Sequence, residues 1–445
     1  MKTPLLLLAL LAAIDGAVAA DTPAPTTSEE LPHFVAAINP TLPQIPERRF
    51  DTRQFGASGD GLATETAALQ AAIDAARAAG GGTVEVPEGV YLCGPLELAS
   101  HLRLHLAKGA VLKMLPLDKY PGGTKTPDDL LGGANLHDIA ISGAGTIDGQ
   151  GAPWWPFAKT KGARRPRMIA LSACARVLIE GVTLRDSPMF HIAIGGASSD
   201  VTVRGVTIRA PSSTDPVTPS HNTDACDVSG NNILVEDCDV SVGDDNFTCG
   251  SNTSNVLIRR CTYGTGHGLS IGSYTRGGVT NFAVLDCTFN GTECGIRIKS
   301  DRDRGGPVQN LFYQNLRMTG VNFPILIYGA YMAPERQYRD LTRLDAKIAA
   351  TYPGRTVEKL TPHFRNIVFR HVTATAAPGR RAGLIWGLPE APATSIVLDD
   401  VHITADRPFG LYCAREVRVL RSSVTTPAGV PAFDTYDVTP ALTLP

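Results

Sequence analysis

One short strand recurs four times in the middle of the chain, as residues 225–230 (ACDVSG), 246–251 (NFTCGS), 268–273 (GLSIGS) and 295–300 (GIRIKS). In each copy apolar residues alternate with small or polar ones, so one face of the strand would be buried and the other exposed. Asp224, Asp245 and His267 directly precede three of the copies. The recurrence therefore predicts stacked coils that carry an acid–base cluster at one position of successive coils.

A second recurrent segment sets the period of these coils. Its copies are VLIEGVTL at Val177, VTVRGVTI at Val201, ILVEDCDV at Ile233, VLIRRCTY at Val256, FAVLDCTF at Phe282, LFYQNLRM at Leu311, IVFRHVTA at Ile367 and IVLDDVHI at Ile396. Most copies begin 23 to 32 residues apart, which is typical of solenoids. The one gap of 56 residues is twice 28 and predicts a degenerate copy hidden around residues 324–364, together with a long insertion. Short strands stacked about 4.8 Å apart predict an all-β parallel β-helix.

An asparagine directly precedes five of these copies, where a coil must turn sharply into its next strand. The five are Asn232, Asn255, Asn281, Asn310 and Asn366. Asparagine tolerates the left-handed backbone conformation and can form hydrogen bonds with its neighbours in a stack. We therefore expect a structural ladder of asparagines along one edge of the coils.

The cysteine positions follow the same repeat. Of nine cysteines, Cys238, Cys261 and Cys287 each lie five residues after the start of a copy, where other copies have Val or Leu. A position that accepts Cys, Val or Leu is a small apolar core position. We expect a stacked column of buried thiols, in which disulfide bonds are allowed but not required. The odd count leaves at least one thiol free.

The chain divides into a leader, a linker and one long domain. Lys2, the apolar run 5–14 and the small residues 17–19 predict a signal peptide over residues 1–19 and a secreted or periplasmic protein. Residues 20–50 are rich in proline and threonine and predict a linker. Residues 51–445 would form a single catalytic β-helix domain with an insertion at about 329–364. Within it, residues 64–79 predict a helix that caps the open end, and residues 338–350 are a second helical candidate.

Composition limits the partners of this protein. The chain has 41 basic and 43 acidic residues and a net charge of -2, so it lacks the global basic field that nucleic-acid binding favours. No stretch after the leader is long and apolar enough to cross a bilayer. We expect a monomer that binds neither nucleic acid nor a membrane, with any anion-binding surface confined to one place.

Three carboxylates and a histidine would share one groove on the outer face of the repeated strands. Asp224, Asp245 and His267 belong to one column, and Asp244 lies one residue further back. Glycoside hydrolysis needs one carboxylic acid to protonate the leaving oxygen and a second carboxylate to activate water or attack the sugar. Crowding three carboxylates would raise the pKa of at least one of them. These residues favour acid–base hydrolysis of a glycoside.

Two cations extend this groove and indicate an anionic sugar. Arg297 and Lys299 lie on the outer face of the last copy of the strand. Arginine can grip a carboxylate through two hydrogen bonds, and lysine adds a point charge. Phe323, the next residue in the column, could stack on a sugar ring.

Four short motifs in this region resemble the signature of a known enzyme family. They are Asn222-Thr223-Asp224, Gly243-Asp244-Asp245, Gly266-His267-Gly268 and Arg297-Ile298-Lys299. In order and separation they resemble the motifs of the polygalacturonases, glycoside hydrolase family 28. Further landmarks are Phe55-Gly56-Ala57, Gly59-Asp60-Gly61, Asp148-Gly149-Gln150-Gly151 with Trp154-Trp155, and Ser187-Pro188, so the resemblance covers roughly residues 50 to 430.

The resemblance implies a right-handed parallel β-helix and inverting hydrolysis of the α-1,4-galacturonosidic bonds of pectin, without a cofactor or a metal. It implies that Asp244 is the general acid and that Asp224 and Asp245 hold and activate the water. His267 would tune the acid or relay protons to it. The remaining positions imply substrate binding by Arg297 and Lys299, an orienting role for Asn222 and a ring contact from Phe323.

The sequence departs from the family pattern at three places. Ala225-Cys226 follows Asp224 where a glycine and a larger apolar residue are expected, and Asn246 follows Asp245 where cysteine is common. Phe323 stands near a position that often carries tyrosine. The first two changes affect packing beneath the site, and the third removes a hydroxyl that could shift substrate preference.

Several alternatives stay open at this point. Within the family, the enzyme could be exo-acting, or could cleave xylogalacturonan or rhamnogalacturonan. A pectate lyase would share the fold and the substrate but would use carboxylates as a Ca²⁺ cage. A non-catalytic carbohydrate-binding β-helix would share the fold alone.

Overall fold

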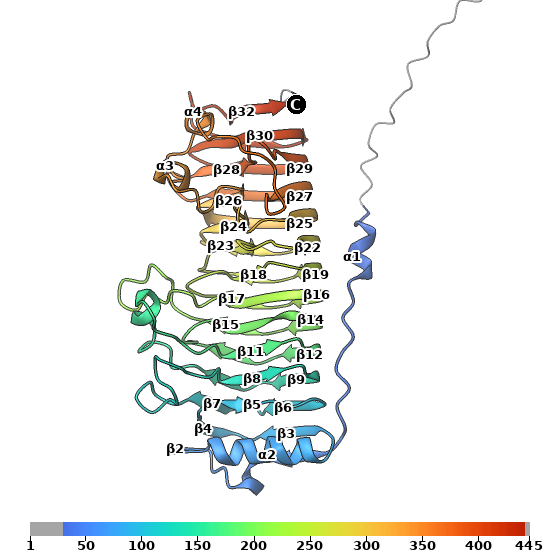
Figure 1. Ribbon diagram of the computed structural model, residues 1–445, viewed down its shortest axis with the longest axis vertical. Helices are drawn as coiled ribbons and strands as arrows, with labels where there is room; N and C mark the ends of the chain where they lie inside the picture. The colour runs from blue at the N-terminus through green and yellow to red at the C-terminus, as the bar shows by residue number, and fades with distance from the viewer. Residues whose placement is uncertain (1–29, 441–445) are drawn as a thin grey trace, which may run out of the picture.

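The computed structural model describes residues 30–440, which form a tall right-handed parallel β-helix (Figure 1). The predicted signal peptide lies outside the described residues. All strand pairings are parallel, and successive coils stack in three faces. The predicted fold class is confirmed.

The face that carries the candidate site has the following strands: β5 (Leu96–Glu97), β8 (Leu131–Ala134), β11 (Ile169–Ser172), the first parts of β14 (Ile192–Arg204) and β16 (Cys226–Glu236), β18 (Phe247–Cys249), β21 (Leu269–Ile271), β24 (Cys294–Lys299), β26 (Phe323–Tyr328), β28 (Arg381–Trp386), the first part of β30 (Arg407–Leu420) and β32 (Phe433–Thr439). We call this the site face.

A second face, which we call the strap face, has the following strands: β1 (Arg49–Asp51), β3 (Gly82–Val86), β6 (Leu102–Leu106), β9 (His137–Gly143), β12 (Ala175–Glu180), the second parts of β14 and β16, β19 (Thr253–Arg259), β22 (Val279–Leu285), the first parts of β25 (Pro307–Val321), β27 (His363–Ala376) and β29 (Ala393–Thr404), and the second part of β30.

The third face completes each coil with shorter strands: β2 (Asp60–Thr64), β4 (Gly89–Cys93), β7 (Ala110–Met114), β10 (Thr146–Asp148), β13 (Thr183–Arg185), β15 (Thr207–Arg209), β17 (Asp239–Ser241), β20 (Thr262–Tyr263), β23 (Thr288–Asn290), the second parts of β25, β27 and β29, and β31 (Ser423–Thr425).

The repeat starts predicted from sequence stack directly on one another. Val201 pairs with Ile233, Ile233 with Val256, and Val256 with Phe282, so equivalent apolar side chains form a column inside the helix. All of these residues are buried. Because each column residue removes apolar area from water, this inner packing stabilises the stack.

The predicted hidden repeat does not exist. Leu311 of β25 pairs directly with Ile367 of β27, so the 56 residues between them make one coil and not two. Most of the extra length is an insertion of about residues 329–362, which leaves the helix after β26 and returns at β27. Spacing alone had suggested two coils because the insertion happens to have the length of one.

The asparagine ladder is confirmed. All five residues have positive φ, between 54° and 61°. Their side chains connect neighbouring coils: the amide of Asn281 donates to Asn255 at 2.9 Å, and that of Asn310 donates to Asn281 at 3.2 Å. The sharp turn and the side-chain stacking therefore require the same residue type.

The capping helix is also confirmed. Helix α2 (Thr66–Ala78) covers the N-terminal end of the stack, and Gly80 follows it with φ +80°. In contrast, the segment predicted as one helix over residues 338–350 forms two short helices, α3 (Arg336–Arg339) and α4 (Ala346–Ala349). Asp340 accepts from the backbone of Thr342 and Asp345 caps α4, so local side-chain hydrogen bonds interrupt the helical pattern.

Residues 30–48, from the predicted linker, lie along the strap face of the β-helix, and we call them the strap (Figure 1). They include helix α1 (His33–Ala37), whose Val35 packs in a cluster with Leu257, Ala283 and Phe312. Further along, Thr41 donates its backbone N–H to Asp200 at 3.0 Å and Gln44 donates to Asp138 at 2.9 Å. The described part of the linker thus belongs to the folded body.

Within residues 30–440, no helix has the length and apolar character needed to span a membrane.

All nine cysteines lie in the described part of the chain, and each is a buried free thiol. Cys238, Cys261 and Cys287 occupy the predicted core column, with backbone carbonyls as hydrogen-bond acceptors within their own coils. Burial raises the pKa of the Cys226 and Cys249 thiols, which makes them poor nucleophiles. The core therefore uses cysteine as an apolar residue.

We predict that the native protein hides its thiols from Ellman's reagent. Without reductant, fewer than one thiol per chain should react within minutes, because every thiol is buried. In concentrated guanidinium all nine should react. Seven reactive thiols under denaturing conditions would instead indicate a disulfide bond, and rapid reaction of the native protein would contradict the buried column.

Candidate active site

The predicted site residues meet in a cavity of 440 Å³ on the site face. The strands β16, β18, β21 and β24 supply its floor, where Asp227 pairs with Thr248, Thr248 with Ser270, and Ser270 with Arg297. The lining includes seven of the eight predicted residues, namely Asn222, Asp224, Asp244, Asp245, His267, Arg297 and Lys299. Stacking of successive coils thus brings together side chains far apart in sequence.

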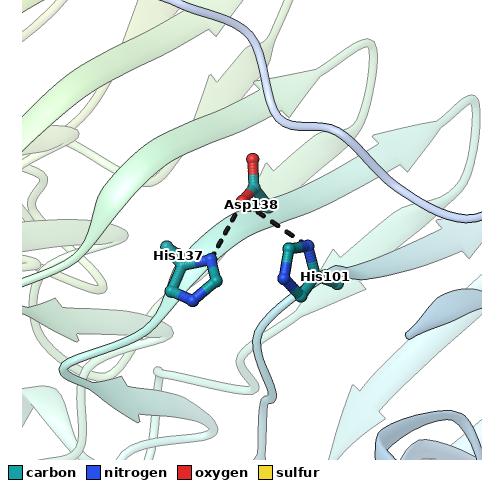
Figure 2. Close-up of side chains that lie close together, drawn as sticks. All are labelled: His101, His137 and Asp138. Carbon is teal, nitrogen blue, oxygen red and sulfur yellow. Dashed lines mark hydrogen bonds and ion pairs between the residues drawn. The ribbon is translucent and has the colours of Figure 1, made fainter. Parts of the chain in front are cut away.

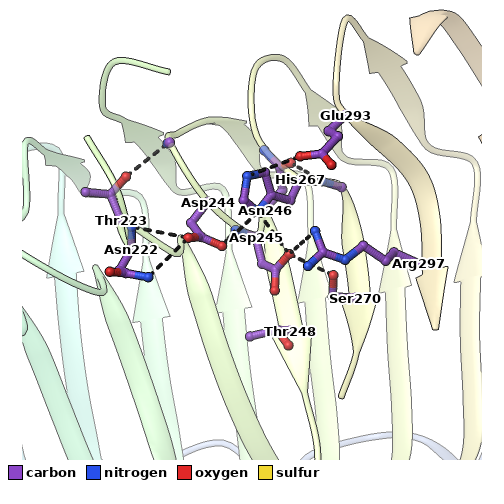
Figure 3. Close-up of polar contacts among 12 residues, drawn as sticks. Asn222, Thr223, Asp244, Asp245, Asn246, Thr248, His267, Ser270, Glu293 and Arg297 are labelled. Carbon is purple, nitrogen blue, oxygen red and sulfur yellow. Dashed lines mark hydrogen bonds and ion pairs between the residues drawn. The ribbon is translucent and has the colours of Figure 1, made fainter. Parts of the chain in front are cut away.

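Asp244 and His267 form an ion pair at the mouth of the cavity (Figure 3). His267 Nδ1 lies 2.9 Å from Asp244 Oδ1. Burial opposes the charge on Asp244, but His267, Lys299 and Arg297 outweigh it and lower the pKa of Asp244 to about 2. Burial also opposes the charge on His267, yet Asp244 raises the histidine pKa above its usual value. In the free protein the proton of this pair therefore lies on His267.

Asp245 is held as a carboxylate. It is buried, and it accepts hydrogen bonds from Ser270 Oγ at 2.7 Å and from Lys299 Nζ at 3.0 Å. Arg297 Nη1 lies 3.5 Å from its other side. Burial alone would raise the pKa of Asp245, but Lys299 and Arg297 lower it below the usual value. Such a carboxylate stays ionised over a wide pH range.

Asp224 is the carboxyl group of the three whose pKa is raised. Its side chain is buried, and its Oδ1 atom lacks a hydrogen-bond partner among the described residues. Burial, followed by the charges of Asp244 and Asp245, raises the pKa of Asp224 well above its usual value. The expectation that one of the three carboxyl pKa values would rise is confirmed, and Asp224 is the residue affected.

Asn246 fixes the loop that carries His267. Its side chain donates to the Thr265 carbonyl at 2.9 Å and accepts from the Gly268 N–H at 2.9 Å. Gly266 and Gly268 both have positive φ, and a side chain at Gly266 would collide with the Asn246 amide. Asn246, a departure from the family pattern, is therefore a positioning residue that sequence reasoning missed.

Asn222 contacts Asp244 through two hydrogen bonds. Its backbone N–H and its side-chain amide both donate to Asp244 Oδ2, at 3.2 and 3.4 Å. The side-chain oxygen of Asn222, Oδ1, in turn accepts from Arg165 Nη2 at 2.8 Å. Arg165 also donates to the Pro188 and His221 carbonyls, so it anchors this wall of the cavity.

Three aromatic residues line the cavity, namely Phe190, Tyr274 and Tyr331, and Phe323 is not among them. Phe323 is 7% exposed and belongs to a separate cluster with Tyr328 and Trp386. Tyr331 lines the cavity, and Lys299 Nζ lies 5.6 Å from the centre of its ring. The strand column suggested Phe323, whereas Tyr331 lies in the loop after β26, outside any repeat pattern.

Two further acids adjoin the site. Asp227 lines the cavity floor, where burial and the charge of Asp245 raise its pKa to about 6. Glu293 Oε2 lies 3.3 Å from His267 Nε2, so the histidine lies between two carboxylates. Because side chains alternate along a strand, the sequence already places Asp227 on the outer face, between the apolar Cys226 and Val228.

The site is arranged as an ion-paired network and not as a cation cage. Ligand atoms of Asp244, Asp245 and His267 do lie within 4.8 Å of one another. However, His267 already pairs with Asp244, and Lys299 and Arg297 already pair with Asp245. The carboxylates thus have protein cations as their partners, an arrangement that supports proton transfer.

The fold and the site together define a parallel β-helix with an acid–base site of carboxylates and cations on one open face. The model of the glycosyl hydrolases family 28 matches residues 81–414. The chain belongs to this family.

Similar proteins agree with this assignment. Over 305 residues the chain is 32% identical to an endo-polygalacturonase of Pectobacterium carotovorum subsp. carotovorum, covering 61% of this chain and 73% of that protein. It is 32% identical over 284 residues to a probable polygalacturonase of Arabidopsis thaliana; the match covers 62% of this chain but 60% of the plant protein. The solved polygalacturonase from Erwinia carotovora ssp. carotovora aligns with a TM-score of 0.68 and 26% identity, covering 85% of this chain and 99% of that one.

The raised pKa of Asp227 predicts a cost in stability at neutral pH. A shift from the ordinary value of 3.8 to about 6 means that the native state binds the proton more tightly than the unfolded state. Stability should therefore fall as pH rises through this window, by at most about 3 kcal/mol. Asp227→Asn should raise the free energy of unfolding at pH 7 by about 1–3 kcal/mol.

Urea denaturation at two pH values tests this expectation. The gain at pH 7 should shrink toward zero at pH 3.5, where the wild-type carboxyl is protonated in both states. An equal effect of the substitution at both pH values would contradict the assigned shift and would point to altered packing.

Proposed function

We propose that this protein hydrolyses α-1,4-galacturonosidic bonds of polygalacturonan by general acid–base catalysis with inversion. The observation that carries this proposal is the joint placement of Asp244, Asp245 and Asp224 with three cations in one cavity. Hydrolysis of a glycoside requires an acid and a base on opposite sides of the bond. Membership of glycosyl hydrolases family 28 and the polygalacturonase relatives support the same reaction.

Asp244 donates the proton to the leaving oxygen. In the free protein the proton lies on His267, whose Nδ1 is 2.9 Å from Asp244 Oδ1 but not aligned for a hydrogen bond, so transfer requires a small rotation of the ring. When the glycosidic oxygen approaches Asp244 and begins to gain negative charge, transfer from His267 through Asp244 becomes favourable. His267 thus stores the proton and Asp244 delivers it.

Asp245 removes a proton from the attacking water. Lys299 and Arg297 keep it ionised, so it is ready to act as a base. Asp224 lies beside it with an oxygen that lacks a partner among residues 30–440. That oxygen can form a hydrogen bond with the water and fix its position for attack.

Arg297 and Lys299 also bind the carboxylate of the sugar at the scissile bond. Both side chains are almost fully buried, so their charges are poorly screened by water and attract an anionic ring strongly. Tyr331 offers its ring face beside Lys299. A neutral sugar would lack the carboxylate that Arg297 and Lys299 are positioned to bind.

A second candidate, exo-action or cleavage close to one end of the polymer, follows from the insertion. Helices α3 and α4 lie beside the upper strands of the site face in Figure 1. The insertion is fixed there by Arg302, which pairs with Glu390 at 2.6 Å, and by Tyr338 and Tyr352 against Trp386. Tyr331 of the insertion lines the cavity beside Lys299, so the insertion borders the cavity at this end. Sizing the earliest products from polygalacturonate separates the cases, since a ladder indicates internal cleavage and monomer or dimer alone indicates exo-action.

Because pectin lies outside the cell, the proposed substrate also requires export. The predicted signal peptide would supply it. N-terminal sequencing of the mature protein should find that residues 1–19 have been removed.

The first test of function replaces the general acid. Asp244→Asn should lower the rate of reducing-end release from polygalacturonate by about 10²- to 10⁴-fold, because the amide cannot donate the proton. Asp239→Asn, which changes an exposed carboxylate on the third face, should leave the rate unchanged. Products that absorb in the ultraviolet, together with loss of activity in EDTA, would indicate a lyase. No reducing ends from any pectin would favour a binding protein.

The second test uses pH. The value of kcat/KM should decline at alkaline pH as His267 loses its proton. The midpoint of this decline should lie above pH 6.5, because Asp244 raises the pKa of His267. In His267→Gln the acid must hold its own proton. The alkaline limb of kcat/KM, which reports groups of the free enzyme, should then move to lower pH, with a lower maximum. An unchanged limb in the variant would exclude His267 as the proton store.

A further inference from the structure

Two histidines and an aspartate converge on the strap face, away from the cavity described above (Figure 2). His101 directly precedes β6, and His137 and Asp138 begin β9 on the next coil. The two coils are joined here by a hydrogen bond from the His101 N–H to the His137 carbonyl, at 3.0 Å. The imidazole rings meet edge to face, with centroids 4.6 Å apart.

Their nitrogen atoms point at one carboxylate oxygen. His137 Nδ1 lies 2.9 Å from Asp138 Oδ2, and His101 Nδ1 lies 3.5 Å from it. All three atoms lie within 4.8 Å of one another. Zinc bonds of about 2.0–2.1 Å in a tetrahedron place neighbouring ligand atoms roughly 3.3 Å apart. The cluster therefore needs only small movements to enclose an ion.

The strap supplies a fourth candidate ligand. The Gln44 carbonyl oxygen lies 3.3 Å from His101 Nδ1. The neighbouring Gln44 N–H donates to Asp138 Oδ1 at 2.9 Å, which fixes this part of the strap over the cluster. An ion bound here would join two coils and the strap.

The carboxylate is held in place by a second layer of contacts. Arg176, on the following coil, donates to both Asp138 oxygens at 2.7 and 2.6 Å. Contacts of this kind orient metal ligands in proteins. The charge of Arg176 also repels a cation, so the binding constant should be moderate. The two imidazoles remain accessible, with side chains 42% and 46% exposed.

We propose that His101, His137 and Asp138, with the Gln44 carbonyl, bind one divalent transition-metal ion of the zinc class and so fasten the strap to the β-helix. Two imidazoles favour zinc, copper or nickel over magnesium and calcium, which prefer oxygen ligands. The site lies on a different face from the acid–base cavity, so the proposal is independent of the proposed hydrolysis.

Calorimetric titration of untagged, EDTA-dialysed protein with ZnCl₂ tests the proposal. One equivalent should bind, and His101→Asn should weaken binding at least about tenfold. Asparagine is suitable because residue 101 has φ 58°, a conformation that asparagine tolerates. The matched control is His33→Asn, which removes an exposed histidine in helix α1. Binding that persists in the His101 variant or disappears in the control would overturn the assignment.

The role of the strap has its own measurement. Saturating Zn²⁺ should slow proteolysis of residues 38–48 in the wild type and raise the melting temperature, since the ion binds only the folded state. Neither effect should occur in His101→Asn, whose folding is checked by circular dichroism. Stoichiometric binding without protection of the strap would remove Gln44 from the ligand set.

Discussion

The parallel pairing of one coil on the next is the constraint on which this structure depends. Backbone hydrogen bonds fix the spacing and register of successive strands, so a residue's place in its coil decides its neighbours. Asp224, Asp245 and His267 are separated by some twenty residues each in sequence, yet they meet because each precedes a strand of the site face. A slip of one residue in a single coil would turn an active-site side chain into the core.

Within that framework, different surroundings give the three aspartates of the site different pKa values. Three aspartates in one cavity have pKa values that differ in direction. Lys299 and Arg297 adjoin Asp245 and His267 adjoins Asp244, whereas at Asp224 burial and the neighbouring aspartates outweigh the attraction of Lys299. The same residue type can therefore act as proton donor, base and water ligand. Burying carboxylates together lowers the stability of the fold at neutral pH, as the raised pKa of Asp227 illustrates.

Much of this arrangement could be predicted from sequence, because a repeat translates sequence position directly into spatial position. The fold, the capping helix, the asparagine ladder and seven of the eight residues predicted to form the site lie where the repeat placed them. The failures lie outside the repeat. Tyr331 reaches the cavity from the loop after β26, and this loop has no counterpart in the repeat. The insertion was mistaken for an extra coil because its length alone does not distinguish a coil from a loop. The pairing of Leu311 with Ile367 shows that no coil lies between them.

The strap has a consequence for how the molecule unfolds. In a solenoid each coil contacts only its neighbours, so such proteins tend to open from an end, one unit after another. The strap contacts distant coils at once, through Val35 near β19 and β22, Thr41 at Asp200 and Gln44 at Asp138. Fraying of the N-terminal coils then requires the release of contacts made in the middle of the stack. The strap thereby adds cooperativity to an architecture that is otherwise one-dimensional.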